Sequence, residues 1–90
     1  MAWRVELGEG AKKDLAKLDK SVAKRLTGFI RGRLMRLADP RSIGEALKGP
    51  ELGDFWKYRV GDFRVIAAIE DAKLLILVVR IGNRREVYKR

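Results

Sequence analysis

The chain has 90 residues, with 21 Lys and Arg against 12 Asp and Glu, which gives a formal charge of +9 and a pI near 10.4. Neither His nor Cys occurs, so Ser-His-Asp and Cys-His catalysis, His-based metal sites and disulfides are excluded. A chain of this length buries one modest core, and we expect a single domain over residues 1–90 that works through its surface.

The sequence also lacks the signals of a membrane or secreted protein. Its longest apolar run, Leu74–Val79, is far shorter than the ~20 residues that a membrane span requires, and no hydrophobic stretch of a signal peptide follows the first residue. We therefore expect a cytoplasmic protein with no membrane partner. The positive charge favours nucleic acid or an acidic protein as the partner.

The first part of the chain is expected to form a strand and two helices. Apolar and charged residues alternate over residues 2–7, which predicts a half-buried strand. From Glu9 to Leu18 apolar residues recur every three or four positions, as in a short amphipathic helix. A second helix is capped by Asp19 or Ser21 and stopped at Asp39-Pro40, and the short link predicts an antiparallel helical hairpin.

A loop and two strands are expected next. Residues 38–53 contain both prolines and predict a loop, with one helical turn around Ile43–Leu47. The period then becomes that of strands over Asp54–Val60 and Phe63–Glu70. Gly61-Asp62 between them is typical of a two-residue type II′ turn, so the two segments should pair as a hairpin.

The last predicted strand, Lys73–Ile81, is apolar at nearly every position and should lie in the centre of the sheet. The element order is then β-α-α-β-β-β. Because a helical hairpin would return the chain to the end of the sheet where the first strand finishes, we expect the second strand to run antiparallel to the first. These elements predict an α+β fold in which both helices cover one face of a small antiparallel sheet.

The predicted hairpin brings cationic side chains together. Its two-residue turn places Arg59 opposite Arg64, and Lys57, two residues before Arg59, lies on the same face. Like charges at paired positions destabilise a hairpin, so folding stability does not explain this arrangement. Phosphate binding does, because a guanidinium group binds phosphate through two hydrogen bonds. The alternative interpretation is that these cations belong to a solvated basic surface that binds no ligand.

The same sheet face is expected to carry apolar residues beside the cations. They are Ile66, Ala68, Leu75, Leu77 and Val79. An uncovered apolar area on a small protein usually marks a partner surface, and the neighbouring positive charge favours an acidic partner.

The chain resembles the RelE/ParE superfamily of bacterial toxins from toxin-antitoxin operons, and the RelE branch most. The resemblance extends over the whole chain and depends on the order and spacing of its segments. They are the opening strand, the Lys-rich helical hairpin with Asp14-Leu15 and Lys17-Leu18, Ala46-Leu47-Lys48-Gly49, the hairpin from Tyr58 to Arg64, and the ending Arg84-Arg85-Glu86-Val87-Tyr88. The resemblance implies a RelE-like fold, a cognate acidic antitoxin as partner, and neither cofactor nor metal.

RelE-type toxins cut messenger RNA in the ribosomal A site by attack of the ribose 2′-hydroxyl on the adjacent phosphate. The resemblance therefore implies a ribosome-dependent, metal-independent endoribonuclease that inhibits translation. Two alternatives remain at this stage. One is a ParE-like toxin that inhibits DNA gyrase, and the other is a relative that binds RNA without cutting it.

By position, the catalytic residues of the RelE branch correspond here to Lys57, Arg59, Arg64, Arg84 and Tyr88. The branch has lysine where this chain has Arg59, and an arginine stays protonated at neutral pH, so it cannot act as the base. The resemblance thus implies Lys57 or Tyr88 as the base, Arg59 and Arg64 as phosphate clamps, and Arg84 as acid or clamp. The residues expected to bind RNA phosphates are Lys48, Lys57, Arg59, Arg64 and Arg85.

Overall fold

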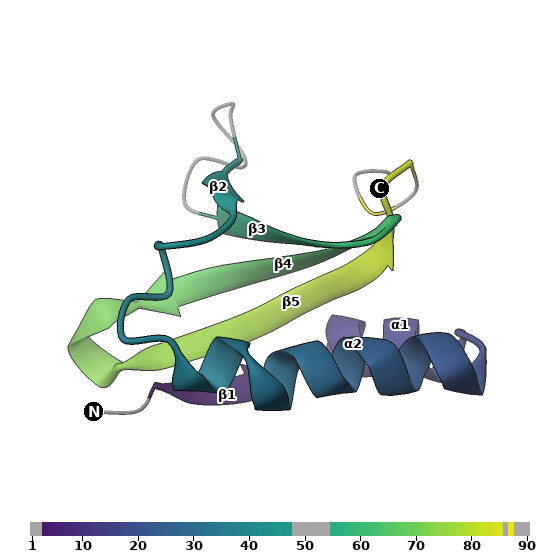
Figure 1. Ribbon diagram of the computed structural model, residues 1–90, viewed down its shortest axis with the longest axis horizontal. Coiled ribbons are helices and arrows are strands. Elements are labelled where there is room, and N and C mark those ends of the chain that lie inside the picture. The colour runs from purple at the N-terminus through teal and green to yellow at the C-terminus, as the bar shows by residue number, and fades with distance from the viewer. Residues whose placement is uncertain (1–2, 48–54, 86, 88–90) are drawn as a thin grey trace.

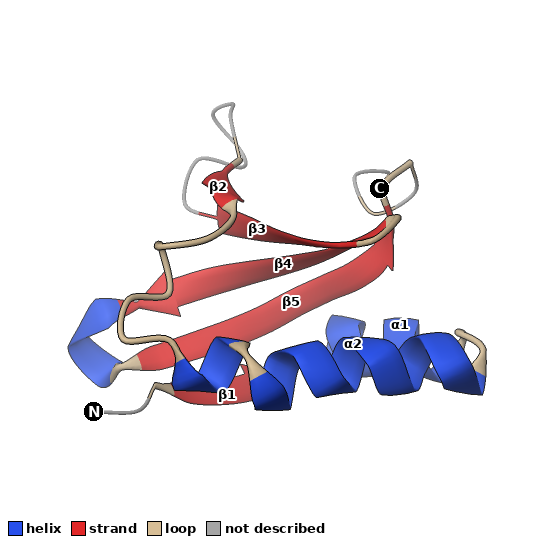
Figure 2. Cartoon of the chain, in the orientation of Figure 1, coloured by secondary structure: helices blue, strands red, loops and turns tan. Residues whose placement is uncertain are grey.

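The computed structural model describes residues 3–47, 55–85 and 87. In chain order its elements are β1 (Arg4–Leu7), α1 (Glu9–Ala16), α2 (Lys20–Gly32), the 3₁₀ helix η1 (Leu34–Arg36), β2 (Glu45–Ala46), β3 (Phe55–Val60), β4 (Phe63–Glu70), the 3₁₀ helix η2 (Asp71–Lys73) and β5 (Leu75–Asn83). The strands form one sheet in the order β1-β5-β4-β3-β2, and α1 and α2 lie on one face of it (Figures 1 and 2). The predicted α+β fold is confirmed, with β5 inside the sheet as expected.

The sheet is mixed, so the prediction of an antiparallel sheet was wrong for its first strand. β1 runs parallel to β5, whereas every other neighbouring pair is antiparallel. Figure 1 shows α1 continuing in the direction of β1 and α2 carrying the chain back. Because α1 has 8 residues and α2 has 13, at a rise of ~1.5 Å per residue the return is the longer leg. β3 therefore begins at the end of the sheet where β1 begins.

The second helix ends earlier than expected. It ends at Gly32, and η1 follows before the chain reaches Asp39-Pro40. Gly28 and Gly32 weaken the last turns of α2, because glycine in a helix costs about 1 kcal/mol relative to alanine. A short, tighter helix thus completes the stretch that the apolar pattern assigns to one long helix.

The helical turn expected around Ile43–Leu47 is absent, and the segment contains β2 instead. Gly44 has a φ of +81°, in the left-handed region that favours glycine. The chain turns there, so that Glu45 pairs with Lys57 of β3. A two-residue strand is too short to show a period in the sequence.

The β3–β4 hairpin has the predicted register. Val60 faces Phe63 and Arg59 faces Arg64. Gly61 has a φ of +60°. Leu74 is the one non-glycine residue of the described chain with a positive φ, so the φ of Asp62 is negative. This is the pattern of the predicted type II′ turn.

The main core lies between the helices and the sheet. Tyr58, Val65, Ile76 and Val78 point into it from the strands, where Leu26 and Ile30 of α2 meet them. Because successive side chains of a strand point to opposite faces, Lys57 and Arg59 lie on the face away from the helices. Ile66 and Val79 form a second, smaller cluster with Leu47, Phe55 and Val87.

Helix α1 covers the part of β5 that extends beyond β1. The carboxylate of Asp14 accepts hydrogen bonds from the Ile81 amide at 2.8 Å and from Nε of Arg80 at 2.9 Å. A main-chain group at the open sheet edge thereby gains a partner. This contact holds the end of β5, from which the chain continues to Arg84.

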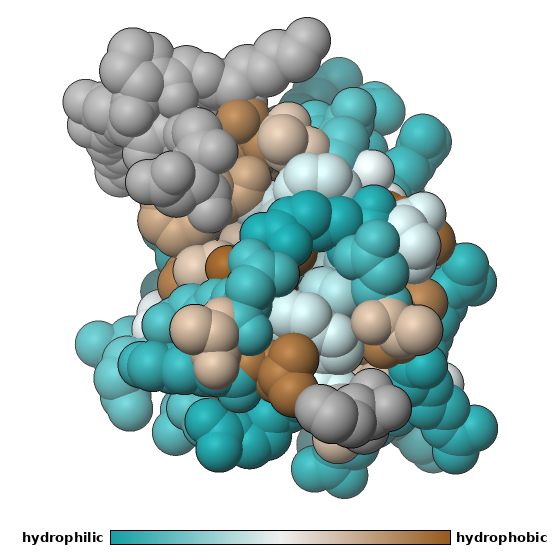
Figure 3. Space-filling view, turned by 90° about the vertical axis from the view of Figure 1, so that its left-hand side faces the viewer, coloured by the Kyte–Doolittle hydropathy of each residue, from teal (hydrophilic) through white to brown (hydrophobic). Residues whose placement is uncertain are grey.

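The surface is mostly hydrophilic at the end of the molecule that contains η2 (Figure 3). Among the described residues, the large hydrophobic side chain classed as exposed is Met35, at 37%. No helix in the described ranges has the length and apolar character needed to cross a membrane.

Candidate functional site

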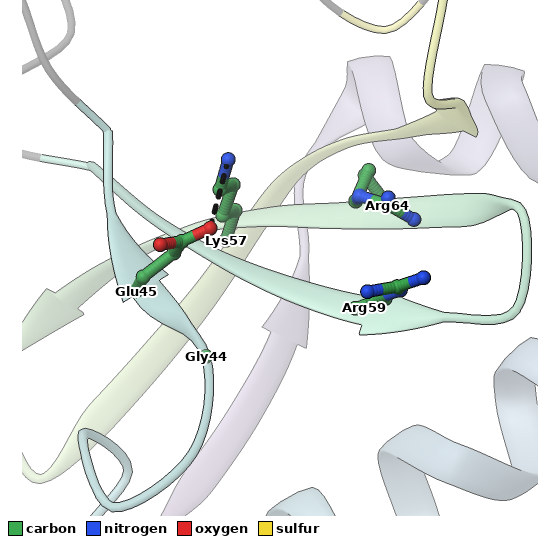
Figure 4. Close-up of a pocket in the computed structure, with 5 residues that line it drawn as sticks. All are labelled: Gly44, Glu45, Lys57, Arg59 and Arg64. Carbon is green, nitrogen blue, oxygen red and sulfur yellow. Dashed lines mark ion pairs between the residues drawn. The ribbon is translucent and has the colours of Figure 1, made fainter.

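A pocket of about 290 Å³ lies on the sheet face away from the helices (Figure 4). Its lining residues are Gly44, Glu45, Lys57, Arg59 and Arg64. β3 contributes Lys57 and Arg59, β4 contributes Arg64, and the segment that enters β2 forms the remaining wall. The structure thus brings three of the predicted site residues together.

Arg59 and Arg64 are direct cross-strand partners, and Figure 4 shows both side chains nearer the hairpin turn than Lys57 is. Nη1 of Arg64 donates hydrogen bonds to the carbonyl oxygens of Gly61, at 3.1 Å, and Phe63, at 2.9 Å. Within the described parts of the chain, no carboxylate oxygen lies within 4.0 Å of either guanidinium group. Two adjacent cations without an acidic partner favour the binding of an anion.

Lys57 lies in the pocket beside an acidic residue, Glu45, that was not predicted as part of the site. Its Nζ is 3.1 Å from Oε1 of Glu45, the residue that pairs with it across β2 and β3 (Figure 4). The Glu45 side chain is 71% exposed and that of Lys57 is 27% exposed. A phosphate that enters the pocket would therefore compete with Glu45 for Lys57.

Three aromatic side chains hold the segment that leads to β2. Nε1 of Trp3 donates to the carbonyl oxygen of Ala38 at 3.2 Å, and the Tyr58 hydroxyl to that of Pro40 at 2.6 Å. Nε1 of Trp56 donates to Ile43 at 2.8 Å. Tyr58 is fully buried, and burial raises the pKa of its hydroxyl to about 12. We call this segment, residues 37–44, the strap.

A salt bridge and a glycine complete the anchoring of the strap. Arg41 donates two hydrogen bonds, at 2.9 and 3.0 Å, to the carboxylate of Asp71 in η2, and this contact lowers the pKa of Asp71. At Gly44 a Cβ atom would overlap the carbonyl oxygen of Lys57. The strap therefore lies directly against β3 and holds Glu45 beside the pocket.

Two of the other predicted site residues, Arg84 and Arg85, do not line the pocket. The amide of Arg84 donates to the carbonyl oxygen of Asp62 at 2.9 Å, which places its backbone beside the hairpin turn. Arg85 follows with its amide bonded to Oδ1 of Asn83 at 3.0 Å, and both arginines are exposed. Lys48 and Tyr88 lie outside the residues that the structure describes. No group of three or more acidic side chains that could hold a metal ion occurs in the described ranges.

Comparison with known proteins shows that this chain is similar to toxins of toxin-antitoxin systems. The family model for the ParE toxin of the type II toxin-antitoxin system parDE matches residues 5–88. Toxin RelG of Mycobacterium tuberculosis (strain ATCC 25618 / H37Rv) is 28% identical over 90 residues, which are 100% of both chains. Toxin RelE of the same strain is 28% identical over 87 residues, covering 97% of this chain and 87% of the relative.

Solved structures of RelE toxins also have a fold similar to that of this chain. A RelBE2 toxin-antitoxin complex of Mycobacterium tuberculosis gives a TM-score of 0.84 at 26% identity, covering 96% of this chain and 95% of that chain. An archaeal RelE-RelB complex of Pyrococcus horikoshii OT3 gives 0.71 at 28% identity, with coverage of 96% and 99%. The isolated E. coli RelE toxin, at 23% identity and a TM-score of 0.69 over 97% of this chain and 92% of that chain, shares the fold.

Proposed function

Because this chain belongs to the family of ParE toxins of type II toxin-antitoxin systems and has a RelE-like fold, we propose that it is a ribosome-dependent endoribonuclease that cuts messenger RNA in the A site. The main support for the proposal is that Arg59 and Arg64 face each other on one side of the pocket. This pair is costly for folding and suited to a phosphate. Lys57 adds a third cation at the same site.

The proposed reaction is attack of a ribose 2′-hydroxyl on the adjacent phosphorus. The bond from O2′ to phosphorus forms while the bond from phosphorus to O5′ breaks, leaving a 2′,3′-cyclic phosphate and a 5′-hydroxyl end. Lys57 or Tyr88 accepts the proton of the 2′-hydroxyl, and Arg84 donates a proton to O5′ or holds the phosphate. Arg59 and Arg64 stabilise the charge that develops on the phosphate oxygens.

The proposed partners follow from charge and from the relatives. A chain with a net charge of +9 favours an acidic antitoxin as well as RNA, and two of the similar solved structures are toxin-antitoxin complexes. We propose a cognate acidic antitoxin, the ribosome and messenger RNA as partners in the cytoplasm. Lys48 and Arg85 would bind RNA phosphates next to the one that is cut.

Primer extension on a defined messenger bound to ribosomes tests the proposal. We expect cuts at the A-site codon with the purified protein, and a loss of cutting of at least about 100-fold with Arg64→Ala, because a cation that stabilises transition-state charge contributes on that scale. Tyr88→Phe tests the proposed role of the Tyr88 hydroxyl in the same assay. An uncut message together with inhibited supercoiling by DNA gyrase would instead identify the gyrase inhibitor.

The ion pair between Glu45 and Lys57 predicts a second result. Glu45→Gln keeps the shape of the side chain and removes the negative charge that competes with phosphate. We expect the affinity for an uncleavable RNA oligonucleotide to increase about two- to fivefold, as for one exposed charge near another. Fluorescence anisotropy at fixed ionic strength measures it, and Glu6→Gln on β1 provides the matched control. Weaker RNA binding by Glu45→Gln would contradict competition at Lys57.

A further inference from the structure

A cation of α2 contacts the turn of the β3–β4 hairpin. A Cβ atom on Gly61 would lie 2.9 Å from Nη2 and 3.2 Å from Nη1 of Arg25, so this guanidinium group packs against the turn. Arg64 contacts the same residue, since its Nη1 donates to the carbonyl oxygen of Gly61 at 3.1 Å. Guanidinium groups from a helix and from the pocket thus meet at one glycine.

In the part of the chain that the structure describes, neither Arg25 nor Arg64 has an acidic partner. Asp62 is the nearest acidic residue in the chain, yet no carboxylate of the described residues lies within 4.0 Å of Arg25 or Arg64. Cations brought together without an anion repel one another, and an exposed arginine is free to turn away into water. The packing of Arg25 on the turn therefore favours an anion that lies over the hairpin end.

The helix layer extends this positive surface. Residues 9–36 contain nine Lys and Arg against three Asp and Glu, a net charge of +6 out of the +9 of the chain. Arg25 belongs to this group and contacts the hairpin turn. It connects the cations of the pocket with those of the helices.

We propose that Arg25 binds an RNA phosphate next to the one that is cut, so that the RNA passes from the pocket across the Gly61 turn onto α2. The inference depends on the proposed function for its ligand, a single-stranded RNA. Phosphate contacts position a nucleic acid without reading its sequence. Arg25 is thus a positioning residue that takes no part in the bond changes.

Two uncleavable RNAs with methylated 2′-hydroxyl groups test this path. One is a dinucleotide, which fills the pocket only, and the other has twelve nucleotides. We expect Arg25→Ala to lower the affinity for the longer RNA about five- to twentyfold and to reduce the salt dependence of binding by about 0.7 in the log–log slope, as for one lost phosphate contact. The affinity for the dinucleotide should stay unchanged.

Lys24→Ala is the matched control, because it removes the same charge from the neighbouring exposed position of α2. We expect less than a twofold effect from it with either RNA. Equal losses for Arg25→Ala and Lys24→Ala, or no loss with Arg25→Ala, would overturn the inference, as would absence of binding by the unaltered protein. Because these RNAs cannot be cut, the outcome is separate from the ribosome assay: the RNA path can stand if cleavage fails, and cleavage can stand if the path fails.

Discussion

Replacing Arg59 with threonine is expected to make the protein more stable and to abolish RNA cleavage. Arg59 and Arg64 face each other across β3 and β4, where Cβ atoms lie about 5 Å apart and like charges destabilise the pair. The Arg59 side chain makes no hydrogen bond or ion pair in the described structure, so its removal leaves no partner unsatisfied. Threonine also suits a strand.

We expect Arg59→Thr to raise the free energy of unfolding by about 0.3–1 kcal/mol and to lower cleavage at least about 100-fold. Urea unfolding and primer extension on ribosomes measure the two effects. Arg31→Ala on α2 is the control for the change in net charge and should alter neither one strongly. A lower stability of the Arg59→Thr protein would contradict the repulsion between Arg59 and Arg64, and with it the reason for proposing phosphate binding there.

The effect of inorganic phosphate on the unfolding temperature provides a second test of anion binding at Arg59 and Arg64. A ligand that binds only the folded state raises its stability. Phosphate at constant ionic strength should therefore raise the unfolding temperature of the unaltered protein more than that of Arg59→Thr. Equal shifts in the two proteins would place the anion elsewhere.

The hairpin could be predicted from the sequence because its turn has only two residues. Once Gly61-Asp62 is placed, one register remains, and the pairing of Arg59 with Arg64 follows without any knowledge of the rest of the fold. The apolar run of β5 similarly indicates a strand inside the sheet. The cationic part of the pocket is thus determined by local information.

The other wall of the pocket depends on distant contacts that no local pattern shows. β2 has two residues, and its position follows from the bonds of Tyr58 to Pro40 and of Trp56 to Ile43. Glu45 for this reason has no place in the predicted site. The direction of β1 was mispredicted for a related reason, because it depends on the relative lengths of α1 and α2. The roles of all the predicted site residues stay predictions, and Lys48 and Tyr88 also lie outside the described residues.

The buried hydroxyl of Tyr58 predicts a loss of stability at alkaline pH. Burial raises the pKa of this group to about 12, against ~10 for an unfolded tyrosine. The unfolded chain therefore loses the proton first, so the stabilisation is complete below pH ~10 and disappears as the pH rises toward 12. The difference of two units between the two pKa values corresponds to about 3 kcal/mol in the free energy of unfolding.

Tyr58→Phe isolates the contribution of the Tyr58 hydroxyl. The variant leaves the carbonyl oxygen of buried Pro40 without its 2.6 Å hydrogen bond, so we expect it to be less stable at pH 8 by about 1–3 kcal/mol. Its stability should then fall less steeply between pH 10 and 12 than that of the unaltered protein. Parallel pH profiles of the two proteins would contradict a raised pKa at Tyr58.

The titration itself can be followed in a Tyr88→Phe background, because the chain contains two tyrosines and Tyr58 is then the only one. We expect its absorbance near 295 nm to change together with unfolding rather than before it, since the folded state resists ionisation. The same residue ties stability to the pocket. Tyr58 lies between Lys57 and Arg59 on β3 and holds the strap, which leads directly to Glu45. We therefore expect the pocket wall and the stability of the strap to be lost in one pH range.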